Sequence, residues 1–429
     1  MSHQKRSSTL KGHVISMGGE GDGLVQTEEG AFYTPFVIPQ EVVQIQPISS
    51  KKALLVEIIH PSSQRVTPVC KHFSVCGGCS LQHISRPSSL LWKQNVVQAA
   101  LSHFPIQTIP LQEYQTQPYQ RRRMDLAVTR LQNNMLAIGL HKRNTKDILN
   151  LMECHVLQPE LFEITKTINP VLQKCSAIKK QASLVANHLT SGIDLLLKTD
   201  APLSTQDRAL LIEFSKAHSS LNRLSWALSP NKGYFFGESI IEPTRPAHIL
   251  NNIRITPPAG AFLQATEDAE QKISHIVASM LQSIKKKKRI IEFYAGCGTL
   301  TFLLAHYGQV TAYEENTEAL QSLREAAQTN QLKIQAIQRN LERQPLLAKE
   351  LEKKADVILL DPPYAGAVHQ IEFIAQSNVK NIIYVSCNPY TLKKDSEILK
   401  QHGYSLKEIA VIDQFLWSAQ MEIICHFYK

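Results

Sequence analysis

The carboxyl-terminal half of the sequence predicts an α/β fold built on a parallel sheet. Short apolar runs at residues 289–293, 357–360 and 381–385 have the composition of buried strands, and turn-forming residues follow each of them closely. Helical segments separate these runs, which is the pattern of strands alternating with helices in a parallel sheet. We therefore expect a ligand site at the carboxyl ends of the strands, where open α/β sheets bind their ligands.

The first of these strands leads into a glycine turn. Gly296 and Gly298 stand between the strand and an apolar helical run; glycine lets the backbone approach a ligand, and the next helix offers free N–H groups. The next strand, residues 310–314, ends at Glu314, a residue type that binds ribose hydroxyls at this position. The next glycine after Gly298 is Gly308, which argues against a pyrophosphate-binding Gly-x-Gly-x-x-Gly motif.

Two further strand ends carry Asp361 and Cys387. Asp361 precedes two prolines, which fix the backbone after it, and Cys387 is followed at once by an asparagine and a proline. A free cysteine often serves only as a small core residue. Its position at a strand end, together with the second such end at Asp361, favours a nucleophile.

Composition limits the classes of protein that the chain fits. Its 429 residues suffice for two or three domains, and the net charge of +9 favours an anionic partner. No apolar segment is long enough to span a membrane, and the first 13 residues lack the apolar core of a secretion leader, so we expect a cytoplasmic protein. The eight cysteines are then better interpreted as thiols, metal ligands or catalysts than as disulfides.

The first predicted domain, residues 1–62, is a small OB-like β-barrel. Short β-rich runs alternate with glycine clusters between residues 9 and 62. Such barrels commonly bind single-stranded nucleic acid. A β-domain that only packs against the rest of the chain is an equally acceptable interpretation.

The second predicted domain, residues 63–253, begins with a group of cysteines. Cys70, Cys76 and Cys79 lie within ten residues, and the two glycines before Cys79 let the backbone fold around an inorganic centre. Four thiolates suit zinc or an iron–sulfur cluster. Cys154 is the expected fourth ligand, with Cys175 as the alternative.

Two other segments of this domain carry a signal. Residues 89–104 have the apolar spacing of an amphipathic helix, and we expect the segment 84–117 to pack on the third domain, residues 254–429. Residues 121–123 are three arginines that lead into a strand, which suits either contacts with RNA phosphates or a solvated turn. Residues 160–250 are poorly informative.

These motifs resemble those of the S-adenosylmethionine-dependent RNA 5-methyluridine methyltransferases over almost the whole chain. The resemblance is to the bacterial branch with a TRAM barrel and a four-cysteine cluster, typified by enzymes of 23S ribosomal RNA. It implies a Rossmann-like class I methyltransferase domain, an amino-terminal TRAM domain and a central iron–sulfur domain. The implied [4Fe-4S] ligands are Cys70, Cys76, Cys79 and Cys154.

The resemblance also implies roles for single residues. Residues 386–395 are similar to the nucleophile motif, so Cys387 would add to C6 of uracil, and residues 413–427 are similar to the motif that supplies a base, here Glu422. Asp361 would orient the uracil. The residues implied in binding S-adenosylmethionine are Gln264 of segment 260–266, Tyr294, Gly296, Gly298, Glu314, Asn340 and Asp361.

The sequence also departs from the family pattern. Tyr364 follows the paired prolines where arginine is usual, Glu292 replaces an aspartate, Leu416 follows Phe415 where proline is usual, and Gln420 replaces a histidine. These changes concern substrate contacts more than the reaction, and we expect a divergent member with an altered target.

The implied function is methylation of C5 of a specific uridine by a monomeric enzyme, with 23S ribosomal RNA as the expected target and transfer RNA as the alternative. Residues 361–364, Asp-Pro-Pro-Tyr, are also a signature of amino-methyltransferases, which need no thiol. A third alternative is an RNA-binding protein that has lost catalysis. Cys387 and Glu422 argue against both of these.

Overall fold

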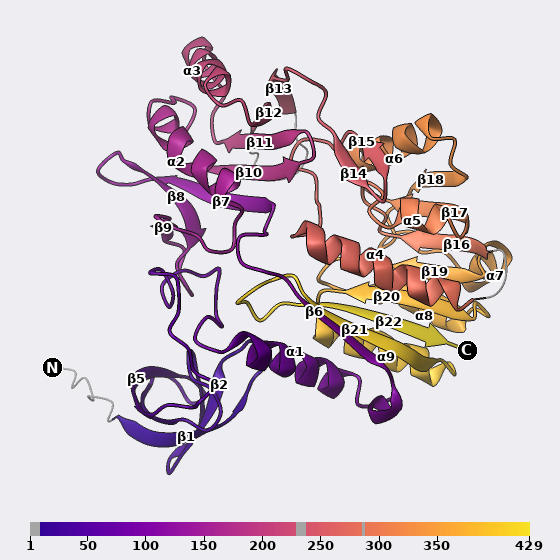
Figure 1. Ribbon diagram of the computed structural model, residues 1–429, viewed down its shortest axis with the longest axis horizontal. Helices are drawn as coiled ribbons and strands as arrows, with labels where there is room; N and C mark the ends of the chain where they lie inside the picture. Colours follow the sequence, from indigo (N-terminus) through magenta and orange to yellow (C-terminus); the bar gives the residue numbers. More distant parts are fainter. Residues whose placement is uncertain (1–8, 229–236, 285–287) are drawn as a thin grey trace.

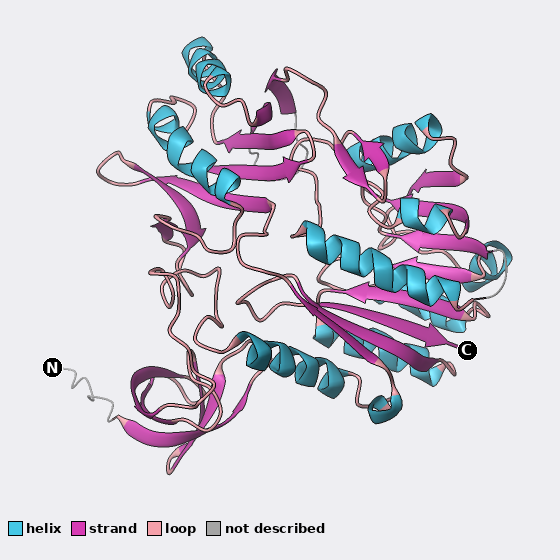
Figure 2. Ribbon diagram, in the orientation of Figure 1, coloured by secondary structure: helices cyan, strands magenta, loops and turns pink. Residues whose placement is uncertain are grey.

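The computed structural model describes residues 9–228, 237–284 and 288–429. The expectation that the first 13 residues are not a secretion leader concerns a segment whose first eight residues lie outside this range. Three bodies follow one another along the chain: an amino-terminal β-body, a central sheet with two helices, and a carboxyl-terminal sheet between helical layers (Figures 1 and 2). None of the helices in the described ranges has the length and apolar content needed to cross a bilayer.

The carboxyl-terminal sheet has eight strands in the order β18-β17-β16-β19-β20-β22-β21-β6. Its members are β16 (Lys288–Phe293), β17 (Gly308–Glu314), β18 (Ile334–Gln338), β19 (Val357–Leu360), β20 (Asn381–Ser386), β21 (Ser405–Asp413), β22 (Glu422–Tyr428) and β6 (Leu111–Gln115). The expected strands are confirmed, but the expectation of a parallel sheet is wrong at one place. β22 runs antiparallel to both neighbours because a short connection, residues 414–421, joins it to β21 as a hairpin.

Helices cover both faces of this sheet, which is why its central strands β19 and β20 are buried along their whole length. Alternate residues of β20 enter opposite cores: Ile382 and Tyr384 enter one, and Ile383 and Val385 enter the other. The first layer contains α1 (Arg86–Ala100), α7 (Ala348–Lys354), α8 (Val368–Gln376) and α9 (Pro389–Gln401). The second contains α4 (Glu267–Gln282), α5 (Thr301–Ala305) and α6 (Thr317–Thr329).

An early segment of the chain therefore belongs to the late sheet. β6 pairs in parallel with β21, and Val97, Leu101 and Phe104, in and just after α1, are buried in the core below β21 and β22. A short 3₁₀ turn, η1 (Ile106–Thr108), joins α1 to β6. Figure 1 shows α1 lying beside β6 and β21, far from the strands of the middle part of the chain, which follow it in sequence.

The central sheet has the order β13-β12-β11-β10-β7-β8-β9. Its strands are β7 (Arg123–Arg130), β8 (Leu136–His141), β9 (Ile148–Asn150), β10 (Gln181–Leu189), β11 (Gly192–Thr199), β12 (Leu221–Leu228) and β13 (Gly237–Ile241). Two helices, α2 (Pro159–Gln173) and α3 (Thr205–Lys216), bury their apolar residues on one face. A hairpin of β14 (His248–Leu250) and β15 (Ile253–Ile255) leads from this sheet to the next domain.

The amino-terminal body is an antiparallel sheet in the order β3-β2-β1-β4-β5. Its strands are β1 (Leu10–Met17), β2 (Gly23–Thr27), β3 (Gly30–Thr34), β4 (Val42–Pro47) and β5 (Ala53–His60). A bridge between Tyr33 and Lys52 brings the two edges together, so the sheet curls back on itself around a small core.

Candidate active site

A cavity of about 1670 Å³ lies at the carboxyl ends of the central strands of the eight-stranded sheet. The strand order reverses between β16 and β19, which is where such sheets form a crevice for ligands. The predicted site residues that line this cavity are Gln264, Tyr294, Gly296, Glu314, Asn340, Asp361, Cys387 and Glu422. Gly298 does not line it. The structure therefore brings all the predicted catalytic and cofactor-binding residues except Gly298 to a single cavity.

The glycine turn has the backbone that its sequence requires. Tyr294 has a φ of 64°, and Gly296 and Gly298 have φ values of 57° and 101°. A Cβ on Gly296 would meet no atom within 4 Å, so the backbone there is open to a ligand. A Cβ on Gly298 would lie 2.6 Å from the ring of Phe302, which explains this glycine by close packing of the turn.

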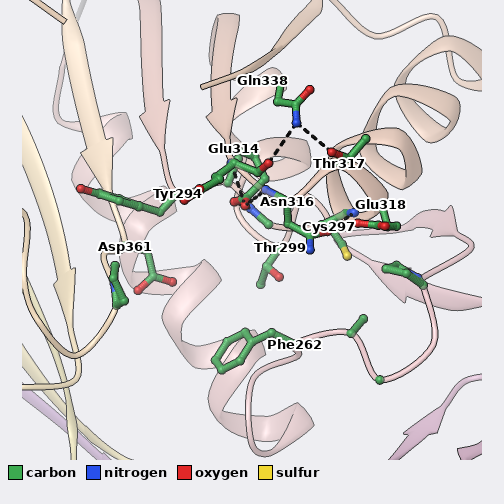
Figure 3. Close-up of a pocket in the computed structure, with 18 of the residues that line it drawn as sticks. Phe262, Tyr294, Cys297, Thr299, Glu314, Asn316, Thr317, Glu318, Gln338 and Asp361 are labelled. Carbon is green, nitrogen blue, oxygen red and sulfur yellow. Dashed lines mark hydrogen bonds between the residues drawn. The ribbon is translucent and has the colours of Figure 1, made fainter. Parts of the chain in front are cut away.

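Glu314 at the end of β17 is oriented by three backbone groups. Its Oε2 accepts a hydrogen bond of 2.8 Å from the N–H of Gly296, and its Oε1 accepts bonds of 2.9 and 2.7 Å from the N–H groups of Glu315 and Asn316. Asn316 caps α6 by accepting from the N–H of Ala319 at 2.7 Å. Figure 3 shows Glu314, Asn316 and Gln338 together on one side of the cavity, with Tyr294 and Asp361 beside them and Phe262 across from them.

Asn340, just after β18, belongs to the same wall. Its Nδ2 donates to Glu315 Oε1 at 2.5 Å, and its Oδ1 accepts from the N–H of Arg343 at 2.8 Å. Gln338 donates through Nε2 to Thr317 Oγ1 at 2.7 Å. These bonds hold polar side chains at the mouth of the cavity around Glu314.

Cys387 stands at the junction of β20 and α9. Asn388 caps this helix by accepting from the N–H of Tyr390 at 2.9 Å, and Pro389 occupies its first turn. The Nδ2 of Asn388 also donates to the carbonyl of Tyr364 at 3.0 Å. This bond ties the turn that carries Cys387 to the turn that follows Asp361.

The acidic groups around Cys387 have strongly perturbed pKa values. Burial raises the pKa of Asp361 to about 7, and burial together with the charge of Asp361 raises that of Glu422 well above its usual value. Burial and the charges of Glu422 and Asp361 raise the pKa of the Cys387 thiol to about 12. Glu292, also in the cavity, has its pKa raised by burial to about 8. Pairs of perturbed acids in a cavity are typical of catalytic sites.

Gln264 and Glu422 share a partner that the sequence analysis does not single out. Gln414, in the connection from β21 to β22, donates to Gln264 Oε1 at 2.8 Å and to Glu422 Oε1 at 2.9 Å. All three side chains are buried. Gln414 lies directly after Asp413 in residues 413–427, the motif that resembles the one supplying a base. The resemblance implies a role for Glu422 of this motif but none for Gln414.

The arginine run has a different role from either expectation. Arg122 is 2% exposed, pairs with Glu270 of α4 at 2.6 Å, and donates through Nε to the carbonyl of Gln264 at 3.2 Å. Arg122 is therefore neither in a solvated turn nor free for a phosphate, because burial demands a partner for its charge. Arg123 lies over the exposed ring of Phe262, at 4.6 Å from its centroid.

The cysteines that sequence predicts as ligands lie near one another. The charge of Cys154 raises the thiol pKa of Cys70, Cys76 and Cys79, in addition to the larger effect of burial on each. Cys175 is buried in the same core as Cys76, but the charged groups that act on its thiol are Asp207 and Arg130 and not the other cysteines. No three His, Cys, Asp or Glu side chains in the described ranges are arranged to hold a metal ion.

Comparison with known proteins decides the family. Residues 251–427 match the sequence model of the family described as tRNA (uracil-5-)-methyltransferase. An uncharacterised RNA methyltransferase of Mesorhizobium japonicum is 34% identical over 96% of this chain and 96% of its own length. The 23S rRNA (uracil(1939)-C(5))-methyltransferase of Vibrio cholerae is 27% identical over 96% of this chain and 93% of its own length. The chain belongs to the RNA uracil-C5 methyltransferase family.

A solved structure shares the fold of this methyltransferase. The tRNA (uracil-54, C5)-methyltransferase of Pyrococcus abyssi, in complex with S-adenosyl-L-homocysteine, superimposes with a TM-score of 0.74. The similarity covers 97% of this chain and 100% of that chain at 18% sequence identity. The two proteins thus share a fold, in which the eight-stranded sheet of this chain is Rossmann-like.

The methyltransferase cavity also has a wall that sequence analysis missed. Lys198 and Arg223, from β11 and β12 of the central sheet, line it opposite the Rossmann-like sheet. Arg223 is buried and forms a two-bond ion pair with Asp194, at 2.7 and 2.8 Å. An alternation of polar and apolar residues along β11 and β12 would have predicted which side chains face the cavity. Both strands are instead mostly apolar and buried, so this alternation is weak.

Proposed function

We propose that this protein transfers a methyl group from S-adenosylmethionine to C5 of a uridine in 23S ribosomal RNA. The observation that carries the proposal is that Cys387, Glu422 and Asp361 line one cavity together with Glu314 and the polar side chains around it, Asn316, Gln338 and Asn340. Membership of the uracil-C5 methyltransferase family supplies the reaction class. The name of the Vibrio cholerae relative supports ribosomal over transfer RNA.

The end of the cavity near Gly296 fits the methyl donor. The open space above Gly296 admits a ligand against the backbone, and the carboxylate of Glu314 lies at the strand end where ribose hydroxyls are bound. The donor supplies an electrophilic methyl group on a sulfonium. Gln264, Tyr294, Asn340 and Asp361 line the rest of this end in our proposal, while Gly298 shapes the turn.

The reaction needs a nucleophile because C5 of uracil is a poor one. In the proposed step, the Cys387 thiolate forms a bond to C6, and the electrons of the C5–C6 double bond move toward the C4 carbonyl as an enolate. C5 then takes the methyl group, and the electron pair of the broken bond stays on the donor sulfur. Glu422 removes the C5 proton, the double bond forms again, and the thiolate leaves.

The ligand-free protein holds Cys387 as a neutral thiol, because burial and two neighbouring acids raise its pKa to about 12. The thiol must therefore lose its proton within the complex. The positive sulfonium of the donor would lower the pKa of the nearby thiol and so oppose the charges of Asp361 and Glu422, which raise it. In the proposed step the thiol proton passes to the carboxylate of Asp361, because Glu422 must stay free to accept the C5 proton. A uridine reaches this depth only when it is unstacked, as single-stranded or loop RNA allows.

The other two bodies serve RNA binding and assembly in this proposal. The curled amino-terminal sheet has the strand content of a TRAM barrel and would hold single-stranded RNA. We propose the thiols of Cys70, Cys76, Cys79 and Cys154, whose charges act on one another, as the ligands of a [4Fe-4S] cluster, since such clusters are held by four cysteine thiolates. We place the protein in the cytoplasm as a monomer.

The test uses cells that lack this gene and are complemented with wild-type protein or with Cys387→Ala. We expect wild type to restore 5-methyluridine at one position of 23S ribosomal RNA, and the variant to restore none, because C5 is not activated without the thiol. Cys425→Ala, a buried cysteine of the same sheet outside the cavity, is the matched control. 5-Methyluridine that persists with Cys387→Ala would contradict the covalent mechanism, and its recovery in transfer RNA would correct the target.

A further inference from the structure

The buried carboxamide of Gln414 lies between the side chain proposed for cofactor binding and the one proposed as the base. We infer that Gln414 is a positioning residue that makes Gln264 present its amino group to the methyl donor and makes Glu422 accept the C5 proton through Oε2. This inference rests on the proposed function and adds a residue to it.

The backbone determines the orientation of Gln414. The N–H of Ala265 donates to Gln414 Oε1 at 3.1 Å, and a backbone N–H has no acceptor form. The oxygen of the carboxamide must therefore face Ala265. Its Nε2 then faces the other way, where it donates one hydrogen to Gln264 and one to Glu422, at 2.8 and 2.9 Å. Every donor and acceptor site of this amide that points to a neighbour has a partner of the right kind.

The orientation of Gln264 follows from that of Gln414. Because Gln414 offers an N–H, Gln264 must present its oxygen to it. Its amino group is then left for the cavity, which Gln264 lines. The group that Gln264 contacts on the methyl donor is consequently an acceptor, such as a carboxylate or a ring nitrogen, and not a hydrogen-bond donor.

Glu422 is constrained by the same amide. Oε1 is engaged by Gln414, whereas Oε2 is buried and has no hydrogen-bond partner among the described residues. The N–H donated to Oε1 lowers the pKa of the carboxyl and so partly opposes burial and the charge of Asp361, which together raise it, and it leaves Oε2 as the oxygen free to take up a proton. Glu422 lines the cavity with Cys387, so the free oxygen belongs to the proposed reaction site.

The backbone on either side of Gln414 is held by buried polar contacts. The Nζ of Lys93 on α1 contacts Asp413 Oδ1 at 2.5 Å and donates to the carbonyl of Gln420 at 2.7 Å. Gln115 of β6 donates to Asp413 Oδ2 at 2.8 Å. The connection from β21 to β22 is thereby fixed at both ends, and the amide of Gln414 has little freedom to rotate away from Gln264 and Glu422.

The experiment separates methyl transfer from release of the methylated RNA. Wild type and Gln414→Leu are mixed with substrate RNA and radiolabelled S-adenosylmethionine in a single turnover, and the covalent protein–RNA adduct is followed on denaturing gels. We expect adduct formation to persist in the variant and its decay to slow by at least about tenfold, because the C5 proton must reach a base that is no longer oriented. Affinity for S-adenosylhomocysteine should fall about 2- to 10-fold, as for loss of one neutral hydrogen bond.

A second variant and a control keep the result interpretable if Gln414→Leu unfolds. Gln414→Glu keeps the shape but places a second carboxyl beside Glu422, so the pH at which adduct decay reaches half its maximal rate should move upward. Gln370→Leu removes another buried glutamine of the same domain, one whose carboxamide bonds the backbone of Leu346 and lies outside the cavity. It should reduce stability without adduct accumulation.

Adduct decay at the wild-type rate and pH dependence in a folded Gln414→Leu or Gln414→Glu would overturn the inference. Accumulation in Gln370→Leu as well would show a general effect of destabilisation and would also overturn it. If wild type itself forms no adduct, while it binds S-adenosylhomocysteine, the proposed covalent reaction fails, and with it this inference. That last outcome is recognised in the wild-type lane before any variant is compared.

Discussion

Among single residues, Glu292 shows how burial holds an acidic side chain of the site in its neutral form at pH 7. The carboxyl is 2% exposed at the end of β16, and its Oε2 has no partner among the described residues. Burial, with smaller effects from the charges of Asp361 and Glu314, raises its pKa to about 8 from 4.5. A cationic methyl donor would offset this accumulation of acidic groups.

Glu292→Gln should change how stability depends on pH. A carboxyl whose folded pKa is raised contributes stability below its unfolded pKa, and this contribution is lost as pH rises through the folded value of about 8. The free energy of unfolding of wild type should therefore fall between pH 5 and 8 relative to the variant, by at most about 1.4 kcal/mol per pH unit. Urea unfolding of the ligand-free proteins at three pH values measures this.

The exposed Glu372 of α8 provides the control, as Glu372→Gln removes a carboxylate outside the cavity. A constant difference in unfolding free energy between wild type and Glu292→Gln across this pH range would contradict the assigned cause.

Among the elements, the connection between β21 and β22 matters most, because it leads into Glu422 and carries Gln414. Lys93 of α1 is fully buried and satisfies three acceptors of this connection: Asp413 Oδ1 and the carbonyls of Phe415 and Gln420. α1 lies outside the segment that matches the family model. An element remote in sequence thus supports the proposed base.

Lys93→Met should destabilise the protein strongly. The methionine fills the space of the side chain but leaves Asp413 buried without its cation, which costs about 3–5 kcal/mol in comparable pairs. Chemical denaturation monitored by circular dichroism would measure the loss. In Lys93→Met combined with Asp413→Asn, much of the loss should be recovered because no charge remains buried. Equal stability of the single and double variants would argue against this explanation.

In the whole molecule, the cysteine group joins three parts of the chain. Segment 71–77 bonds to segment 141–153 through Lys71 N–H to Glu153 and Gly77 N–H to the carbonyl of His141, at 2.5 and 2.9 Å. Directly after Cys79, the N–H groups of Ser80 and Leu81 donate to the carbonyl of Trp417 in the β21–β22 connection. A cluster on these thiols would brace the segment that follows the amino-terminal body, the central sheet and the β21–β22 connection together.

Cys154→Ser should therefore loosen the assembly as well as lower the metal content. Anaerobically purified wild type is expected to be brown with about four irons per chain, and the variant to lose most of this iron. Limited proteolysis should then release residues 1–62 from the variant faster than from wild type. Cys175→Ala is the control, because the charges that act on the Cys175 thiol come from Asp207 and Arg130 and not from the other cysteines, so this variant should retain the iron. A colourless wild type with one zinc would refute the cluster.

The sequence alone predicted the features that depend on neighbouring residues. Strand ends at Glu314, Asp361 and Cys387 are local events, since an apolar run followed by a turn identifies each of them. The class of the fold and the chemistry of these residues followed from such local patterns. The antiparallel β22 was not predicted, because strand direction depends on which neighbour a strand finds.

Only the tertiary structure decided how distant side chains share a buried polar site. Gln414 and Gln264 are 150 positions apart, and Lys93 and Asp413 are 320 apart, so no periodicity links them. The arginine run was misread for the same reason: burial of Arg122 against Glu270 depends on helix α4. Local sequence placed Cys387 at the end of a strand, and the family resemblance singled out Glu422. The buried hydrogen-bond network, which exists only after long-range packing, determines the orientation of their atoms.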